Sequence, residues 1–171
     1  MPCPQNFPKP SRYWPSQLLG PDRRLNLSGQ QSTDSQELTV TLIREDNVQG
    51  IFTQRRLLYK FKSDKQSPGG REVIQYVFRR WRPGSPTPQS PQSLLELIGR
   101  VLERQSEWPD AGPIVLHCRD GSAEAGLFCC VSLLLERLKS EHMIDVFRTV
   151  RALQLQRPLL FTRTVSLDLK S

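Results

Sequence analysis

The sequence predicts an α/β (α+β) fold in which helices flank a twisted, mixed sheet. Three observations predict this class. Strand-like runs occupy most of 37–81, apolar residues at helical spacing occupy most of 93–157, and a short apolar run at 113–117 enters a tight loop. A strand that passes through such a loop into a helix is a place where anions bind in α/β domains.

The predicted strands lie in the first half of the chain. In "ELTVTLIRE" (37–45) apolar and polar residues alternate, as they do in a half-buried strand. "IFTQRRLLYKFK" (51–62) and "REVIQYVFRRW" (71–81) carry aromatic and β-branched residues that favour strands. The polar stretch 63–70 predicts a turn. We therefore expect these three runs to form an antiparallel meander.

Three helices and one further strand are predicted in the second half. The helices are an amphipathic one at 93–105, a strongly apolar one at 125–139, and one at 144–157 that Pro158 ends. "PIVLH" (113–117) is short and mostly apolar, so we expect a buried central strand. The residues expected to face inward are Leu94, Leu95, Ile98, Val101 and Leu102 in the first helix and Ile144, Val146, Phe147, Val150 and Leu153 in the third.

Length and proline content suggest how the chain is organised. With 171 residues the chain has the length of one domain. Six of its 14 prolines precede residue 22, so 1–35 is expected to be largely irregular, and the proline-rich stretch 82–91 is expected to be a loop. No apolar run approaches the ~18 residues that span a bilayer, so we expect no membrane segment in this chain.

Charge and cysteine usage exclude several classes of protein. A net charge of +7 suits nucleic acid, an acidic membrane surface or phosphorylated partners. However, the basic residues are scattered without interleaved aromatics, so we expect a solvated basic face and no nucleic acid. The four cysteines have no C-x-x-C spacing and the two histidines do not complete a zinc site. We expect no disulfide framework, no metal, no cofactor and a reducing compartment.

The loop after the predicted strand at 113–117 carries the most specific motif. A cysteine in a loop that opens onto a helix N-terminus is favoured as a thiolate nucleophile. "VLHCRDGSAEAG" (115–126) has this arrangement. It resembles the active-site loop of the protein tyrosine phosphatases, where His-Cys is followed by five residues, an arginine, a Ser or Thr and a glycine. The resemblance implies that Cys118 holds the nucleophile position, and it assigns to the phosphate loop Arg119, Asp120, Gly121, Ser122, Ala123 and Gly126.

The resemblance extends beyond the loop. "SRYWPSQLLG", "REVIQYVFRRW" and "LLLERLKSEHMIDVFRTVRALQLQRP" are similar to segments of this family in the family's order, over roughly 12–159. The amino-acid sequence of these segments is most similar to the second, membrane-distal domain of receptor-type enzymes, such as the leukocyte common antigen and receptor types alpha and epsilon. This implies a partial tyrosine-phosphatase-like domain at 36–161, truncated at both ends, a divergent tail at 162–171, and a cytoplasmic location beneath a membrane receptor.

The general acid of the family is missing at its expected position. By resemblance the acid follows the tryptophan of "WRP" (81–83), where this chain has Pro83, which carries no acidic proton. "WPD" (108–110) is similar in wording but ends eight positions before Cys118. If 113–117 is extended at ~3.3 Å per residue, that aspartate lies up to about 25 Å from the thiol, whereas a general acid must approach to ~3 Å. We interpret 108–110 as a turn.

The phosphate clamp is altered as well. The family's arginine grips two phosphate oxygens and stabilises the charge of the transition state. Here its position holds Glu124, and Ala125 replaces the Ser or Thr that stabilises the departing thiolate. Glu124 and Asp120 would each repel a phosphate by ~1–4 kcal/mol, and Arg119 is expected to point away. The family's glutamine loop is also absent after "QRP", so we predict negligible turnover.

Several other residues near the loop have structural interpretations. Two interpretations of Cys118 stay open. It is either an inert cysteine at a strand end or a thiol that undergoes reversible oxidation. Cysteines 129–130 are expected in the core, His117 is expected to orient the loop, and the arginines of 79–82 are expected to form a solvated face.

Three functions follow from these expectations. The first is a degenerate pseudophosphatase module that binds phosphotyrosine-signalling proteins or a catalytic phosphatase domain. The second is an active protein-tyrosine phosphatase that uses Cys118, and the third is a truncated product without independent function. Because strands at 37–79 would expose edges and apolar faces, we also expect the isolated chain to be marginally stable unless a partner covers them.

Overall fold

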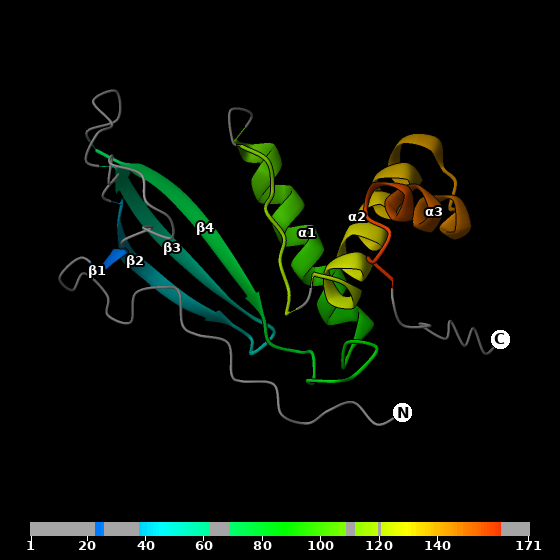
Figure 1. Cartoon of the computed structure of the whole chain (residues 1–171), viewed down its shortest axis with the longest axis horizontal. Coiled ribbons are helices and arrows are strands. Elements are labelled where there is room, and N and C mark those ends of the chain that lie inside the picture. The colour runs from blue at the N-terminus through cyan, green and yellow to red at the C-terminus, as the bar shows by residue number, and fades with distance from the viewer. Residues whose placement is uncertain (1–22, 26–37, 62–68, 109–111, 120, 162–171) are drawn as a thin grey trace. The chain divides into compact units, whose positions relative to one another are not determined.

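A computed structural model of the chain describes residues 23–25, 38–61, 69–108, 112–119 and 121–161 (Figure 1). The described residues fall into two compact units, a strand unit that ends at Arg79 and a helical unit that begins at Arg80. Four strands and three helices confirm the predicted α+β class. Most of the segment 1–35, the predicted turn at 63–70 up to residue 68, and the tail at 162–171 lie outside the described residues.

The strand unit is one antiparallel sheet in the order β1-β2-β3-β4 (Figure 1). The strands are β1 Arg23–Leu25, β2 Leu38–Val48, β3 Phe52–Phe61 and β4 Arg71–Phe78. The predicted meander of three strands is confirmed. The short β1 lies within the segment 1–35, which is expected to be largely irregular, and its three residues pair with Leu38–Val40 at the start of β2. All described pairings in this sheet are antiparallel.

Two backbone features fix the register of β2 and β3. Gln49 and Gly50 have φ values of 49° and 66°, and the Ile51 N–H donates to the Val48 carbonyl at 2.8 Å, which is the geometry of a type I′ hairpin turn. Farther along, the ladder skips Ile43 in a β-bulge. The turn sets the register from Val48 back to Arg44, so that a carboxylate meets a buried arginine across the strands, and the bulge shifts only the pairs from Leu42 onward.

That arginine is Arg55, which is only 2% exposed at the centre of the sheet. Its Nε donates to the Glu45 carboxylate on β2, and its Nη1 donates to Oε1 of Gln75 on β4 at 2.9 Å. Each partner lies directly opposite Arg55 in the ladder. A buried charge is tolerated when it is paired and hydrogen-bonded in this way.

The helical unit contains α1 Pro91–Glu107, α2 Ala123–Glu141 and α3 Val146–Gln156. Within this unit α2 contacts both α1 and α3 (Figure 1). Ser90 and Asp145 cap α1 and α3, because their side-chain oxygens accept from the N–H groups of Ser93 and Arg148. The three predicted helices are therefore confirmed, with ends shifted by a few residues. Among the described residues, none of these helices has the length and apolar character needed to cross a bilayer.

The predicted inward faces of two helices are partly wrong. In α1 the buried residues are Leu94, Leu97 and Ile98, while Leu95 is exposed. On and just before α3, Ile144, Val146 and Phe147 are exposed instead of inward. The buried residue of α3 is Thr149, because its face meets α2 and its hydroxyl is satisfied there. That hydroxyl donates to the Asp145 carbonyl at 2.8 Å and accepts from Arg137 of α2 at 3.5 Å.

The predicted central strand at 113–117 is wrong. The structure assigns no strand to this segment, and its five residues are exposed, with Val115 at 84%. A strand exists only where its backbone groups pair with a neighbour. None of the strand pairings among the described residues involves 113–117.

Candidate phosphate-loop site

The residues assigned to the phosphate loop lead into the N-terminus of α2. Cys118 is half-buried, Arg119 is exposed, and Asp120 lies outside the described residues. Gly121 has a φ of 70°, a left-handed conformation that glycine adopts at little cost. The buried Ser122 is the N-cap residue, although its side chain makes no capping hydrogen bond to the helix. The loop thus passes through Gly121 into α2, as the sequence pattern predicts.

Glu124 and Ala125 lie in the first turn of α2, immediately after the loop. Glu124 is half-buried, and it is the acidic residue of that turn. Ala125 is only 6% exposed, so its methyl group occupies a closed position. A negative charge in the first turn of a helix is compatible with the helix dipole, so the local structure accommodates a glutamate at this position.

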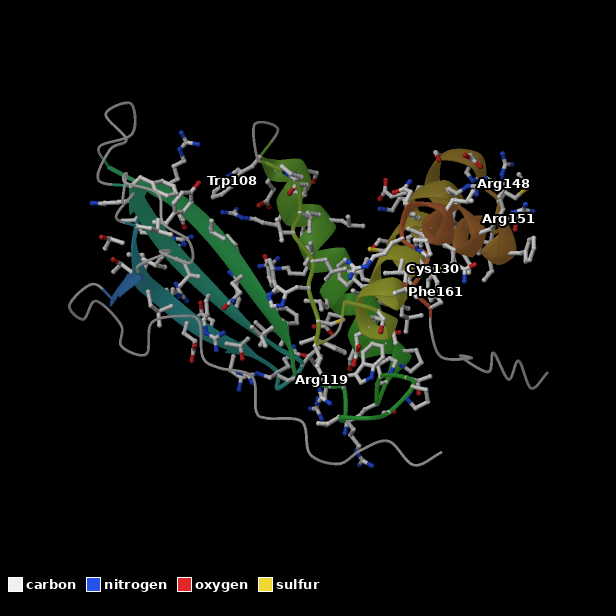
Figure 2. The ribbon with its side chains drawn as sticks, in the orientation of Figure 1. Trp108, Arg119, Cys130, Arg148, Arg151 and Phe161 are labelled. Carbon is white, nitrogen blue, oxygen red and sulfur yellow. The ribbon has the colours of Figure 1, made fainter. Side chains whose placement is uncertain are left out.

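Gly126 completes the loop motif and allows α2 to approach the turn after α3. Its N–H donates to the Ser122 carbonyl at 2.7 Å. A Cβ at this position would lie 2.9 Å from the Leu160 carbonyl oxygen and 2.9 Å from the Phe161 ring. Figure 2 labels Phe161 near the start of the helix. The glycine is therefore required by close packing inside the helical unit.

A cation that the sequence did not predict lies against the loop. The guanidinium of Arg157, the C-cap residue of α3, packs on Gly121 so closely that a Cβ there would overlap it and lie 3.1 Å from Cζ. Arg157 is 36 positions away from Gly121 in sequence, and no local pattern relates the two. The only hint in the sequence is that Arg157 belongs to the "QRP" motif, near the end of the region that resembles the family. The arrangement puts one positive charge beside the loop that also carries Glu124.

The predicted acid position belongs to a tight turn in the loop before α1. Pro83 is exposed, Gly84 has a φ of 81°, and the Ser85 N–H donates to the Arg82 carbonyl at 3.0 Å. Proline followed by a glycine of positive φ is the pattern of a type II turn. The Trp81 indole closes the turn by donating to the Ser85 carbonyl at 3.0 Å. Pro83 therefore has a structural role, and its ring offers no proton donor.

The similar wording at 108–110 lies at the end of α1. Trp108 is the C-cap residue, and the Arg104 guanidinium stacks 3.9 Å from the centre of its ring. Figure 2 labels Trp108 at this end of the helix. Its aspartate, Asp110, lies outside the described residues. The interpretation of 108–110 as a turn remains a prediction.

The cysteines inside α2 differ in burial. Cys130 is buried, in agreement with its predicted place in the core, whereas Cys129 is half-buried. Burial raises the pKa of both thiols, and the neighbouring Cys129 raises the pKa of Cys130 further. Both thiols are therefore held in the neutral form. Among the described residues, no group of His, Cys, Asp and Glu is arranged to hold a metal ion.

Comparison with known proteins identifies the family. The family model described as protein-tyrosine phosphatase matches residues 5–167 of the chain. A "Receptor-type tyrosine-protein phosphatase" of Caenorhabditis elegans is 40% identical over 153 residues, which cover 89% of this chain and 10% of that protein. "Receptor-type tyrosine-protein phosphatase alpha" of Homo sapiens is 32% identical over 150 residues, which cover 88% of this chain and 16% of that protein.

A third relative, "Tyrosine-protein phosphatase Lar" of Drosophila melanogaster, is 37% identical over 102 residues, or 59% of this chain and 5% of that protein. The chain thus spans a sixth or less of the length of these relatives. The match of the family model covers nearly the whole chain, including the loop from Cys118 to Gly126. The chain therefore belongs to the protein-tyrosine phosphatase family, as a domain of the receptor type.

Proposed function

We propose that this chain is a degenerate phosphatase-family module that acts by binding or regulation and hydrolyses little or no phosphotyrosine. The observation that carries the proposal is the half-buried Glu124 in the first turn of α2, six positions after Cys118. An oxyanion above the thiol needs a cation at this position, and a carboxylate repels it by ~1–4 kcal/mol. The position that needs a positive charge to bind the phosphate therefore carries a negative charge.

Two further positions support the same conclusion. Ala125 has no hydroxyl to stabilise a departing thiolate, and its burial leaves little room for water to do so. Pro83, at the acid position, has no proton to transfer to the leaving oxygen and is held in a turn. Each loss typically costs orders of magnitude in rate. Together they leave Cys118 as a nucleophile without an acid, a clamp or a leaving-group stabiliser.

We infer that the chain corresponds to the second, membrane-distal domain of a receptor-type enzyme. The "HCRDGS" wording supports this assignment, as does the identity with receptor-type relatives. In this role the module would bind a catalytic phosphatase domain or phosphotyrosine-signalling proteins on the cytoplasmic side of a membrane. Because the proposed site repels phosphate, we expect partner binding to be equally strong with phosphorylated and unphosphorylated partners.

A second candidate is an active protein-tyrosine phosphatase that uses Cys118. The contact of the Arg157 guanidinium with Gly121 favours it, because a cation beside the loop offsets part of the charge of Glu124. In that case Arg157 would take over phosphate binding from the missing arginine. Such an enzyme would still lack an acid at Pro83, so it would favour aryl phosphates with good leaving groups.

Hydrolysis of p-nitrophenyl phosphate separates the two candidates. The proposal predicts that the chain and its Cys118→Ser variant release nitrophenol at the same background rate. A rate that disappears in Cys118→Ser would overturn the proposal. If that rate also falls in Arg157→Ala but not in the exposed Arg82→Ala, the second candidate is the correct one. Circular dichroism of each variant checks that the substitutions leave the fold intact.

A further inference from the structure

The outward side of α3 combines exposed apolar residues with arginines. Phe147 and Leu155 are 76% and 79% exposed, and Arg148 and Arg151 are exposed between them. Ile144 before the helix and Leu159 after it are also exposed, at 58% and 71%. We call these six residues the outer α3 face. Figure 2 labels the two arginines on this helix.

The spacing puts the helical members of this face on one side of the helix. At about 100° per residue, Phe147, Arg151, Leu155 and Arg148 fall within an arc of about 100°. The buried Thr149 lies outside this arc, on the side that meets α2. The outer α3 face is therefore a second amphipathic face, which packing within the helical unit leaves uncovered.

The charges of this face have one sign. Between residues 144 and 160 the chain has three arginines and a single carboxylate, Asp145. That carboxylate already accepts a hydrogen bond from the Arg148 backbone N–H as the cap of the helix. No ion pair of Arg148 or Arg151 is found with another described residue. The occupant of the face must therefore supply both negative charge and an apolar environment.

We propose that the outer α3 face binds an anionic lipid bilayer. A second copy of the chain is disfavoured, because like faces would bring arginine against arginine. A protein partner usually needs 20–30 residues on each side of the interface, far more than this face offers. A bilayer requires no such area, because each basic residue near an anionic surface raises the partition coefficient about fivefold and each inserted apolar side chain adds to it.

The geometry of the helix suits this orientation. The backbone groups within α3 are already hydrogen-bonded along the helix, so its side can enter the interface without exposing unpaired polar atoms to lipid. Phe147 and Leu155 would enter the acyl boundary. The arginine stems would lie along it, with the guanidinium groups at the lipid phosphates. The proposal does not involve Cys118 and stands independently of the catalytic state of the loop.

Vesicle co-sedimentation of the full chain tests the proposal. We expect binding to vesicles of phosphatidylcholine with phosphatidylserine, little binding to phosphatidylcholine alone, and weaker binding at high salt. Arg148→Glu with Arg151→Glu should lower the partition coefficient at least tenfold. Phe147→Ser with Leu155→Ser, which keeps the charge unchanged, should lower it several-fold. All four residues are exposed, so both variants should retain the circular dichroism spectrum of the parent.

A matched control separates this face from the general positive charge of the chain. Arg80→Glu with Arg82→Glu changes the net charge by the same amount at exposed positions outside α3. We expect this control to lose less than threefold in binding. Equal losses in the control and in the Arg148/Arg151 variant would overturn the proposal, and so would a lack of binding to phosphatidylserine vesicles. Binding of an acidic helical peptide without vesicle binding would assign the face to a protein partner instead.

Discussion

At residue 126 the absence of a side chain lets α2 approach the turn after α3. A Cβ there would lie 2.9 Å from a backbone carbonyl oxygen, which cannot move aside as a flexible side chain can. Gly126→Ala should therefore destabilise the chain by ~1–3 kcal/mol through overpacking. Urea unfolding followed by circular dichroism measures this difference.

Gly99 provides the matched control in α1. A Cβ at Gly99 meets nothing within 4 Å, so Gly99→Ala should stabilise the chain by ~0.5–1 kcal/mol through helix propensity alone. The two substitutions are chemically identical and opposite in predicted sign. A stabilising Gly126→Ala would contradict the described contact with Leu160.

Cys130 makes stability depend on pH. Its pKa is raised by burial and, to a lesser extent, by Cys129, so the folded state prefers the neutral thiol. The resulting stabilisation is complete below the pKa of the unfolded thiol and is lost as pH rises through the pKa of the folded thiol. The free energy of unfolding should therefore fall from neutral to alkaline pH.

Comparison with Cys130→Ala isolates this effect, because lysines and tyrosines titrate in both proteins. The decline in unfolding free energy should be less steep in the variant. Equal slopes would mean that burial of the Cys130 thiol has no influence on its ionisation.

At the residue scale, the sequence predicts which residues form the loop better than it predicts which residues pack against the loop. The His-Cys motif and the glycines identify the stretch from Cys118 to Gly126, because the motif is contiguous. The contact between Gly121 and Arg157 could not be predicted, since it joins residues 36 positions apart through the packing of α3. The catalytic consequence of Glu124 and Pro83 remains a prediction from resemblance and charge.

At the scale of elements, α2 ends in a strained position. His142 adopts a φ of 55° at the C-cap, where its N–H donates to the Leu138 carbonyl at 3.2 Å. Glycine is favoured in this left-handed conformation because it has no Cβ. His142→Gly should raise the free energy of unfolding by up to about 1 kcal/mol, measured by urea denaturation. His142→Ala should give no gain, and an equal gain from both would show that the backbone conformation is not the cause.

The three helices were predictable, because periodicity and caps are local. The face of α3 was not, because Phe147 is apolar yet Thr149 makes the contact with α2 through a satisfied hydroxyl. The prediction of a strand at 113–117 was wrong for a related reason. An apolar run indicates a tendency to be buried, but a strand also requires a neighbour to pair with.

At the scale of the whole chain, exposed apolar surface should limit stability. Val115, Phe147, Leu155 and Leu159 are each more than 70% exposed. Apolar side chains that stay exposed contribute no burial energy to the folded state, and marginal domains have only a few kcal/mol in reserve. We expect the isolated chain to lose its structure below body temperature. Scanning calorimetry measures this, and a cooperative transition of a monomer well above body temperature would contradict it.

The central claim is that the carboxylate of Glu124 prevents an oxyanion from binding above Cys118. Tungstate, a tetrahedral dianion, tests it directly in a calorimetric titration of the chain and of Glu124→Arg, with Glu103→Arg as a control for added charge. We expect no saturable binding of tungstate by the chain or by Glu103→Arg, and saturable binding by Glu124→Arg. Saturable binding of tungstate by the unmodified chain, lost in Cys118→Ser or Arg157→Ala, would contradict it.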